Sequence, residues 1–387
     1  MIPDEFVSPG AMEEAIERRA IDWKESRNLP PLLKRILTRG APMVDGPSSG
    51  EILTAGDESP LQAALRIVPR LKDSALIIQG PPGCGKTYTG SHVIAELLNE
   101  GRNVGIVSNS HKAIINLLRA TGKVVGGDFR AIYPGKDKND PLFVEFPGII
   151  RAASGSKGAE AYVDGLIAGT AWLFSRADME DRLDYLFVDE AGQVSLANLV
   201  AMSACARNIV LLGDQMQLAQ PIQGSHPGET GSSALEYMLG EHATMPPDRG
   251  IFLGTSYRMH PQVCSFISEI VYEGRLHAAE NNELQVLTLP ENASLLKTNS
   301  GILFTPPPHT GNTQASEEEA DAIAQITDEL LLSRFTDKKG EKLLETKRKE
   351  NPSRWVKGTV RNCQPSGQVN LYPINNRTLE KYQKNVA

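Results

Sequence analysis

The feature that most constrains this chain is the glycine-rich octapeptide GPPGCGKT at residues 80–87. It fits the pattern GxxxxGK[ST], and it follows the short apolar run ALIIQ at 75–79. An amphipathic helical stretch from Thr87 to Asn99 comes directly after it. The strand–turn–helix context is the one in which this pattern binds phosphate, and it argues against a plain Gly/Pro connection. The sequence therefore predicts a phosphate-binding loop at the end of a buried strand.

Each fixed position of that pattern has a chemical role. Glycines 80, 83 and 85 allow the backbone to curl, so that its N–H groups converge on phosphate oxygens beside a helix N-terminus. Lys86 is predicted to place its charge on the β- and γ-phosphates, and the hydroxyl of Thr87 to bind Mg²⁺. The expected ligands are ATP and Mg²⁺.

Apolar strand-like runs alternate with helical patterns along this part of the chain. Further strands are predicted at 103–108, 185–189 and 208–214, with a helix at 111–120. Such alternation predicts an α/β fold in which helices cover both faces of a parallel sheet. Ligands of such sheets bind beyond the carboxyl ends of the strands, where the predicted motifs lie.

Composition excludes some classes of protein. The chain has 387 residues with 40% apolar and 22% charged, enough for two globular domains. It lacks an apolar run of membrane-spanning length and a signal-like N-terminus, which predicts a cytoplasmic protein with no membrane partner. A net charge of −7 disfavours a surface that coats nucleic acid everywhere, although it allows a locally basic groove. The four cysteines form no CxxC pair, which gives little support to a zinc site.

Two more strand ends carry polar groups suited to phosphate chemistry. Asp189 is predicted to hold Mg²⁺, and the adjacent Glu190 to orient and deprotonate an attacking water. Gln217, in the segment GDQMQL, is a candidate sensor of the γ-phosphate, and Asp214 could couple that state to a nucleic-acid site. A polar turn without function is an equally simple interpretation of GDQMQL alone.

Taken in order, GPPGCGKT, DEAGQ, GDQMQL and YRMHP (257–261) resemble motifs I to IV of the superfamily 1 helicases, in the versions of the 5′-to-3′ branch. The segment VSNSHKAIINLL (107–118) resembles motif Ia of bacterial members that are often fused to a RecB-like nuclease. The resemblance spans roughly residues 58–335. It implies a RecA-like P-loop NTPase fold, the Walker A type of phosphate loop, and a partial second RecA-like domain.

The resemblance also implies residue roles. Gln62 matches an adenine-contacting glutamine, and Tyr257 is expected to stack on the adenine base. Arg258 matches an arginine finger, which in related NTPases is worth about 10³ to 10⁵ in rate. A surface turn with a buried tyrosine is the alternative for 257–258. The catalytic residues expected are Glu190, Lys86, Arg258 and Gln217.

A nucleic-acid contact is expected after the second strand. Ser110, His111 and Lys112 start a helix and offer polar groups to phosphates without reading sequence. Simple capping of that helix by Ser110 is the alternative, and the two roles are compatible. Thr170 matches another strand contact of the family. Trp172 could stack a base, but a core position is the favoured interpretation. The expected partner is single-stranded nucleic acid, DNA rather than RNA, with a nuclease domain or subunit as a further partner.

These patterns divide the chain into four parts. Residues 1–58 are predicted as a leader and linker, 59–248 as the first RecA-like, ATP-binding domain, and 249–335 as a partial second one. Residues 336–387 are charged and irregular, lack the last two helicase motifs, and suggest a disordered or frameshifted segment.

Within the partial second domain, a capping box from Ser316 to Glu319 predicts a helix. The helix is expected to bury an apolar face made of Ala320, Ile323, Ile326 and Leu330.

Two functions remain open at this point. The first is an ATP-dependent helicase or translocase in DNA repair or processing, and therefore an ATP hydrolase. The second is a non-translocating nucleotide-binding module or a truncated helicase remnant.

Overall fold

A computed structural model of the chain describes residues 10–46, 50–54, 56–127, 129–135, 137–217, 227–307 and 316–341. The described chain forms two compact units. The first takes in the residues up to Gly254 together with Val271–Arg275, and the second takes in Thr255–Ile270 and the residues from Leu276 onward. Each unit is described by itself below.

Within the described residues, the first unit contains ten α-helices and eight strands. The helices are α1 (Gly10–Ser26), α2 (Pro31–Leu37), α3 (Pro60–Ile67), α4 (Lys86–Asn99), α5 (His111–Val125), α6 (Pro141–Glu145), α7 (Gly155–Ala161), α8 (Ala171–Phe174), α9 (Leu196–Met202) and α10 (Ala234–Leu239). The strands are β1 (Ala75–Gln79), β2 (Val104–Val107), β3 (Ala131–Tyr133), β4 (Ile149–Arg151), β5 (Leu166–Gly169), β6 (Leu183–Asp189), β7 (Ala206–Gly213) and β8 (Gly250–Phe252).

The eight strands form one sheet in the order β4-β3-β5-β2-β6-β7-β1-β8, and every pairing in it is parallel. The predicted parallel sheet is confirmed. β1 occupies the predicted residues, and β2, β6 and β7 lie within two residues of theirs. β3, β4, β5 and β8 are three or four residues long, and such short runs carry too little periodicity to be recognised in a sequence.

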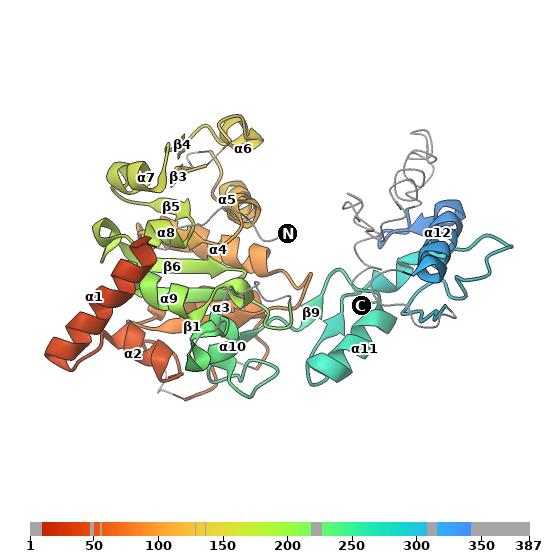
Figure 1. Cartoon of the computed structure of the whole chain (residues 1–387), viewed down its shortest axis with the longest axis horizontal. Coiled ribbons are helices and arrows are strands. Elements are labelled where there is room, and N and C mark those ends of the chain that lie inside the picture. The colour runs from red at the N-terminus through yellow and green to blue at the C-terminus, as the bar shows by residue number, and fades with distance from the viewer. Residues whose placement is uncertain are drawn as a thin grey trace. The chain divides into compact units, whose positions relative to one another are not determined.

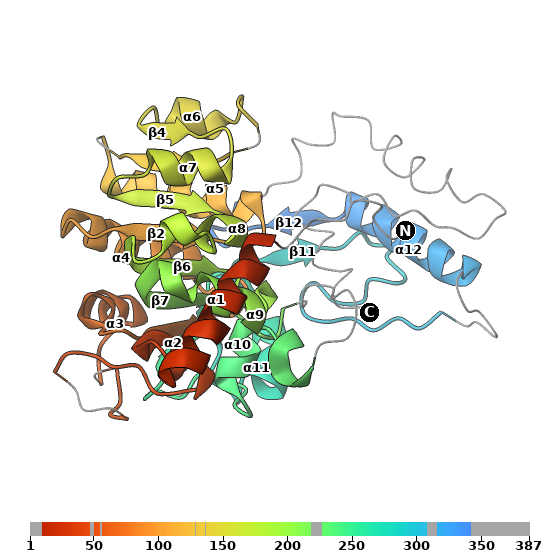
Figure 2. The same cartoon turned by 60° about the vertical axis from the view of Figure 1, so that its left-hand side comes forward.

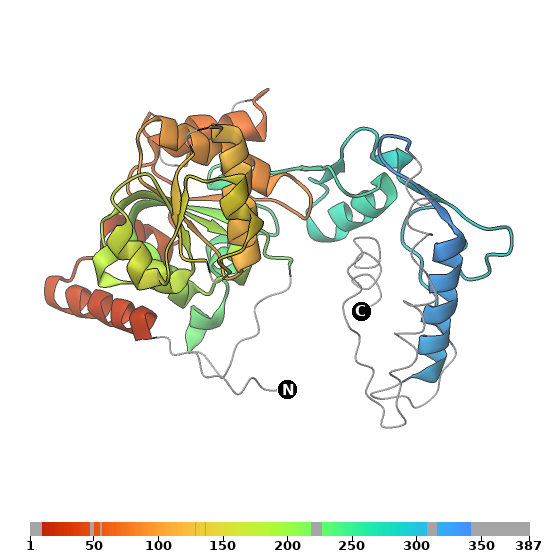
Figure 3. The same cartoon turned by 90° about the horizontal axis from the view of Figure 1, so that it is seen from above.

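Helices cover both faces of this sheet (Figures 1 and 3). On one face, α4 packs against α5 and against β7, where Gly90 lies so close to Leu212 that a Cβ would approach its side chain to 2.7 Å. On the other face, α1, α8 and α9 pack together (Figure 2). Alternate residues of β1 and β7 point to opposite faces of the sheet. Ile77 and Leu211 belong to the core under α1 and α9.

Residues 10–37 form two helices that pack on the first unit. Met12 and Ala15 of α1, with Leu32 and Ile36 of α2, join the buried core beside the sheet. Within the described residues, no helix combines the length and the apolar character needed to cross a membrane.

The described part of the second unit has two helices and two small sheets. The helices are α11 (Pro261–Val271) and α12 (Glu317–Leu332). The short strands β9 (Thr255–Ser256) and β10 (His277–Ala278) pair in parallel, and β11 (Val286–Thr288) pairs antiparallel with β12 (Arg334–Thr336), as Figure 2 shows for the latter pair.

The helix predicted after Ser316 is α12, and the Ser316 hydroxyl accepts from the backbone N–H of Glu319 as expected. The predicted apolar face is only partly covered within the described chain: Ile323 is 56% exposed, whereas Ala320, Ile326 and Leu330 are partly buried. The side chain that α12 buries is Glu329, whose carboxylate accepts hydrogen bonds from the backbone N–H groups of residues 294–296. The predicted irregular segment lies largely outside the described residues, from 342 onward.

Candidate phosphate and nucleic-acid sites

The glycine-rich loop connects β1 to α4 as predicted. Gly83 and Gly85 have φ values of 83° and 87°, in the left-handed region that glycine adopts without steric cost. Gly85 is the N-cap residue of α4, and no side chain caps that end. The first N–H groups of α4 therefore keep their capacity to bind an anion.

Three side chains from three separate strand ends meet beside this loop. The Nζ of Lys86 donates to the carbonyl oxygen of Gly80 at 2.7 Å. With its amide oriented to satisfy both neighbours, Gln217 donates to Oε2 of Glu190 at 3.2 Å and accepts from Nζ of Lys86 at 3.3 Å. The structure thus brings together the predicted phosphate lysine, the predicted base and the predicted γ-phosphate sensor.

Backbone geometry gives the two acidic residues different environments. Asp189 ends β6 and is 4% exposed, whereas Glu190 adopts the left-handed conformation with a φ of 56° and is partly exposed. Burial, and then the charge of Glu190, raise the pKa of Asp189 to about 6. A left-handed non-glycine residue is strained, and such strain is typical of functional positions.

The residues present fit a magnesium ion. The described residues contain no cluster of three or more His, Cys, Asp or Glu side chains able to enclose a metal. Mg²⁺ does not need such a cluster, because it is usually bound by one or two carboxylates, water and substrate phosphates. Asp189 supplies a buried carboxylate of this kind, and Thr87 supplies a hydroxyl in the first turn of α4.

The predicted nucleic-acid residues lie at the same edge of the sheet. Val107 of β2 pairs with Gly169 of β5, so the segments that begin at Ser108 and Thr170 leave neighbouring strand ends together. Ser110 and Thr170 are the N-cap residues of α5 and α8, and neither side chain makes a capping hydrogen bond. The capping alternative for Ser110 is therefore wrong, while Lys112 stays exposed on α5.

Two side chains near this edge have surroundings that the sequence analysis did not predict. His111 is partly buried, and its Nδ1 lies 2.8 Å from the hydroxyl of Tyr133, so its ring is held by β3. Burial raises the pKa of Tyr133 to about 12, so the phenol stays protonated. Trp172 is 38% exposed, and the favoured core position for it is wrong.

Gln62 has a structural role that the sequence analysis missed. Its side-chain Oε1 accepts from the backbone N–H of Ser59 at 2.9 Å, and the Ser59 hydroxyl accepts from the N–H of Gln62 at 3.3 Å. This is a complete capping box at the start of α3. The spacing Ser-x-x-Gln was the signal that could have revealed it. The predicted adenine contact of Gln62 stays a prediction.

Tyr257 and Arg258 belong to the second unit, in an exposed turn after β9. Tyr257 is 56% exposed, so the alternative of a buried tyrosine is wrong. The fully buried Asn282 holds the turn by donating to the carbonyl oxygens of Ser256 at 2.8 Å and Met259 at 2.9 Å. No local sequence signal marked Asn282, because it acts 23 and 26 residues away from its partners.

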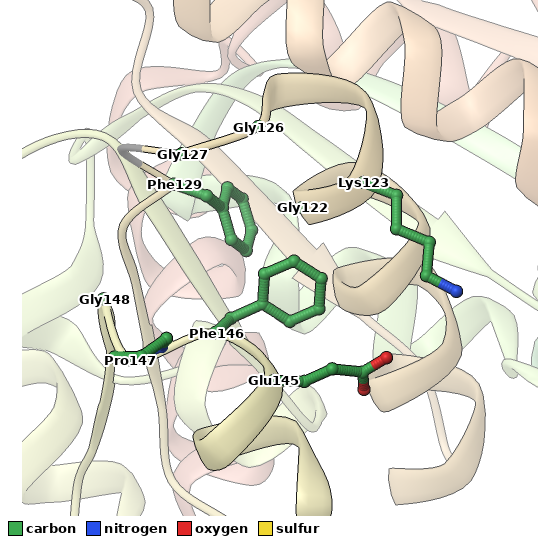
Figure 4. Close-up of a pocket in the computed structure, with 9 residues that line it drawn as sticks. All are labelled: Gly122, Lys123, Gly126, Gly127, Phe129, Glu145, Phe146, Pro147 and Gly148. Atoms are coloured by element: carbon green, nitrogen blue, oxygen red, sulfur yellow. The ribbon is translucent and has the colours of Figure 1, made fainter.

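A separate pocket of about 300 Å³ lies at the C-terminal end of α5 (Figure 4). The rings of Phe129 and Phe146 face each other edge to face, with centroids 5.7 Å apart. Gly122 provides one wall, where a Cβ would approach Phe146 to 2.6 Å. Because α5 begins at the carboxyl edge of the sheet and runs away from it, this pocket is not part of the phosphate site.

Two family models match the chain, and both are described as AAA domain. One covers residues 62–229, and the other covers residues 231–342. The first match contains the phosphate loop, DEAGQ and Gln217, and the second contains YRMHP and α12.

Curated relatives carry one recurring name. The chain is 27% identical over 247 residues to the DNA replication ATP-dependent helicase/nuclease DNA2 of Gallus gallus, which covers 62% of this chain and 24% of the relative. It is 30% identical over 207 residues to the protein of that name from Schizosaccharomyces pombe, covering 52% and 14%. The chain thus spans about a quarter or less of the relatives' length. An arterivirus nonstructural protein 10 helicase, solved with DNA, aligns with a TM-score of 0.35 and 19% identity over 53% of this chain and 41% of that one.

The parallel sheet, the glycine-rich loop at the end of β1 and the acidic end of β6 define a P-loop NTPase of the RecA-like fold. The order of its motifs, the two AAA domain models and the helicase/nuclease relatives support a superfamily 1 helicase. The narrower resemblance to RecB-like nuclease fusions stays a prediction.

Proposed function

We propose that this chain is an ATP-dependent helicase or translocase that acts on single-stranded DNA in replication, repair or related processing. The observation that carries the proposal is the contact of Lys86, Glu190 and Gln217 at the carboxyl edge of the sheet. These groups come from three motifs that are far apart in the sequence. The relatives named as DNA replication helicase/nucleases support DNA over RNA and support a nuclease domain or subunit as a partner.

The proposed chemistry is phosphoryl transfer from ATP to water. The N–H groups of the loop and the ammonium of Lys86 would bind the phosphates, and Lys86 would exchange its present contact with Gly80 for phosphate oxygens. Glu190 would orient a water and accept its proton on a carboxylate oxygen. Gln217 touches both Lys86 and Glu190, and it would therefore report which of them is engaged with substrate.

The proposed magnesium ligands are Thr87 and Asp189. When bound, the ion would neutralise negative charge on phosphate oxygens. The proposed adenine contacts are Gln62 and Tyr257, and Arg258 is proposed as an arginine finger from the second unit. The roles of Tyr257 and Arg258 rest on family resemblance, and an Arg258→Lys variant tests the second of them, since lysine keeps the charge but not the planar fork.

The proposed nucleic-acid contacts are Ser110, His111, Lys112 and Thr170, at the ends of β2 and β5. Support comes from the pairing of these strands and from the helix N-termini that follow both of them. Contacts of this type would hold the phosphate backbone without sequence preference. The domain boundaries predicted from the sequence and a cytoplasmic location belong to the same proposal.

The test is ATP hydrolysis by the purified chain with and without single-stranded oligothymidine, with Lys86→Ala as the blank. Strong stimulation that the variant loses would support a motor. Glu190→Gln should bind nucleotide but turn over about 10²–10⁴-fold more slowly, because it removes the base and keeps the side-chain shape. Nucleotide binding without strand-stimulated turnover would instead favour a non-translocating nucleotide-binding module.

A matched oligouridine RNA and a strand-displacement assay complete the test. Equal stimulation by RNA would contradict the preference for DNA. Turnover without displacement would restrict the proposal to translocation.

A further inference from the structure

The segment Val271–Arg275 has an unusual place in the fold. The chain leaves the first unit after Gly254, returns to it for these five residues, and leaves again at Leu276. The outward and returning stretches lie against each other, because a Cβ on Gly254 would come within 2.8 Å of the carbonyl oxygen of Arg275. The contacts that hold this segment in the first unit therefore also fix the positions at which the chain continues into the second unit.

Tyr272 provides one of two attachments of this segment. Its hydroxyl donates to Oδ2 of Asp214 at 2.8 Å, and both residues are buried, at 3% and 1% exposure. Asp214 follows β7 directly and lies three residues before Gln217. Removing the hydrogen-bond partner of a buried carboxylate costs free energy, so the Tyr272–Asp214 hydrogen bond stabilises the attachment of this segment.

Arg275 provides the second attachment. Its guanidinium donates to the hydroxyl of Thr244 at 2.7 Å and to the carbonyl oxygen of Met245 at 2.9 Å. It also lies over the ring of Phe252, 4.7 Å from the centroid. The Thr244 hydroxyl in turn donates to the carboxylate of Glu273.

The buried side-chain amide of Gln79 connects these attachments to the phosphate loop. Gln79, the last residue of β1, accepts from the N–H of Met245 at 2.6 Å and donates to Ala243 O at 3.0 Å. It also donates to Oε1 of Gln215 at 2.7 Å. Gln79 is fully buried and immediately precedes Gly80, while Gln215 lies between Asp214 and Gln217. The segment is thus tied to the ends of both β1 and β7.

We propose that Tyr272 is a positioning residue that couples the nucleotide state of the phosphate site to nucleic-acid binding by holding Val271–Arg275 against Asp214. This inference rests on the proposed function, since it assumes that the chain binds both ligands. A shift of Gln217 on nucleotide binding would move the β7 end and its partner Tyr272. The positions at which the chain continues into the second unit would then move with Tyr272.

The test is the coupling between the two ligands in the full chain. Binding of fluorescent single-stranded oligothymidine is titrated with and without a non-hydrolysable ATP analogue, in the parent and in Tyr272→Phe. The variant keeps the ring and removes the hydroxyl. The analogue should change strand affinity in the parent by about 5- to 150-fold, the usual range of allosteric coupling. In Tyr272→Phe this factor should fall to less than about twofold, with nucleotide affinity unchanged.

Tyr162→Phe is the matched control. Tyr162 is also buried, and its hydroxyl donates to the carbonyl oxygen of Gly165 at 3.0 Å, next to β5, which β2 and β6 separate from β7 in the sheet. It should keep the parental coupling. If Tyr272→Phe does not fold, Arg275→Gln removes the second attachment and should lower the coupling in the same way. Thermal melting of each variant separates lost coupling from lost stability.

The outcomes distinguish the two proposals. Coupling in the parent that persists in Tyr272→Phe would overturn the positioning role and leave the proposed function standing. A parent that binds nucleotide but shows no coupling to the strand would overturn both. Reduced coupling in Tyr162→Phe as well would also overturn the assignment to Tyr272, because the effect would not be local.

Discussion

The helices α4 and α12 show how differently the two units are held together. Both are long and amphipathic, with 14 and 16 residues. α4 buries Val93, Ile94 and Leu97 against the sheet, whereas the side chain that α12 buries is the carboxylate of Glu329. The first unit is organised by apolar packing on parallel strands, whereas α12 of the second unit is attached through hydrogen bonds to a polar side chain. A sequence pattern alone does not tell these two arrangements apart.

The largest expected effect is the loss of stability when a buried side chain of the sheet in the first unit is truncated. Phe187 on β6 is fully buried, and Phe187→Ala should lower the free energy of unfolding by about 3–5 kcal/mol, through lost burial and the cavity left behind. Urea denaturation followed by circular dichroism measures the loss. Val144→Ala, at a side chain that is 84% exposed, is the control and should change little. A loss below about 1 kcal/mol for Phe187→Ala would contradict the apolar basis of this unit.

A smaller effect is expected from the buried carboxylate of the second unit. Glu329→Gln replaces a charged acceptor of several N–H groups with a neutral amide, and should cost about 1–3 kcal/mol locally. Hydrogen–deuterium exchange of the amides of residues 294–296 measures it, and protection should fall there. The neighbouring exposed Asp328→Asn should leave protection unchanged. Unchanged exchange in Glu329→Gln would mean that these hydrogen bonds do not hold α12.

The same carboxylate predicts a dependence on pH. Burial acts to raise the pKa of Glu329, but the N–H groups of Leu296, Ser294 and Leu295 outweigh it and hold that pKa at about 2, below its ordinary 4.5. Because the folded-state pKa is lowered, this stabilisation is complete above pH 4.5 and is lost as the pH falls toward 2. Exchange protection of residues 294–296 should decline over that interval in the parent. Glu329→Gln should lack this decline, and a decline that persisted in it would assign the titration to another group.

The smallest effect is expected on the apolar face of α12. Ile323→Ala should change stability by no more than about 0.5 kcal/mol, because the side chain is 56% exposed. Chemical denaturation of the full chain measures this, with the fully buried Ile94 of α4 replaced in the same way for comparison. A loss at Ile323 equal to that at Ile94 would show that the α12 face is covered in solution.

Local sequence patterns were sufficient to predict those elements whose structure depends on residues close together in the sequence. The strand–loop–helix at β1, the phosphate loop and α4 was predicted within one residue, because glycine spacing and apolar periodicity act over a single turn. The packing of the helices at 10–37 on the first unit was not predicted, since an amphipathic pattern says that a face is buried but not what covers it.

No local sequence pattern predicted the contacts between segments that are far apart in the sequence. Asp214 and Tyr272 are 58 residues apart, and Gln79 and Met245 are 166 apart. The sequence analysis predicted ligand contacts for Gln62 and His111 but not their contacts with Ser59 and Tyr133. A polar side chain suits several partners equally well, and only its surroundings in the fold select one.

By itself, the sequence determined the class of this protein: a parallel α/β sheet, a phosphate loop at the end of its first strand, and acidic and amide groups at later strand ends. Those features follow from local backbone conformation and from hydrophobic periodicity, which short stretches of chain encode. Three features became visible in the folded chain alone: Lys86, Glu190 and Gln217 touch, Tyr272 holds Asp214, and α12 buries a carboxylate. Each of these depends on where distant segments cross, which is set by the packing of the whole unit rather than by any one segment.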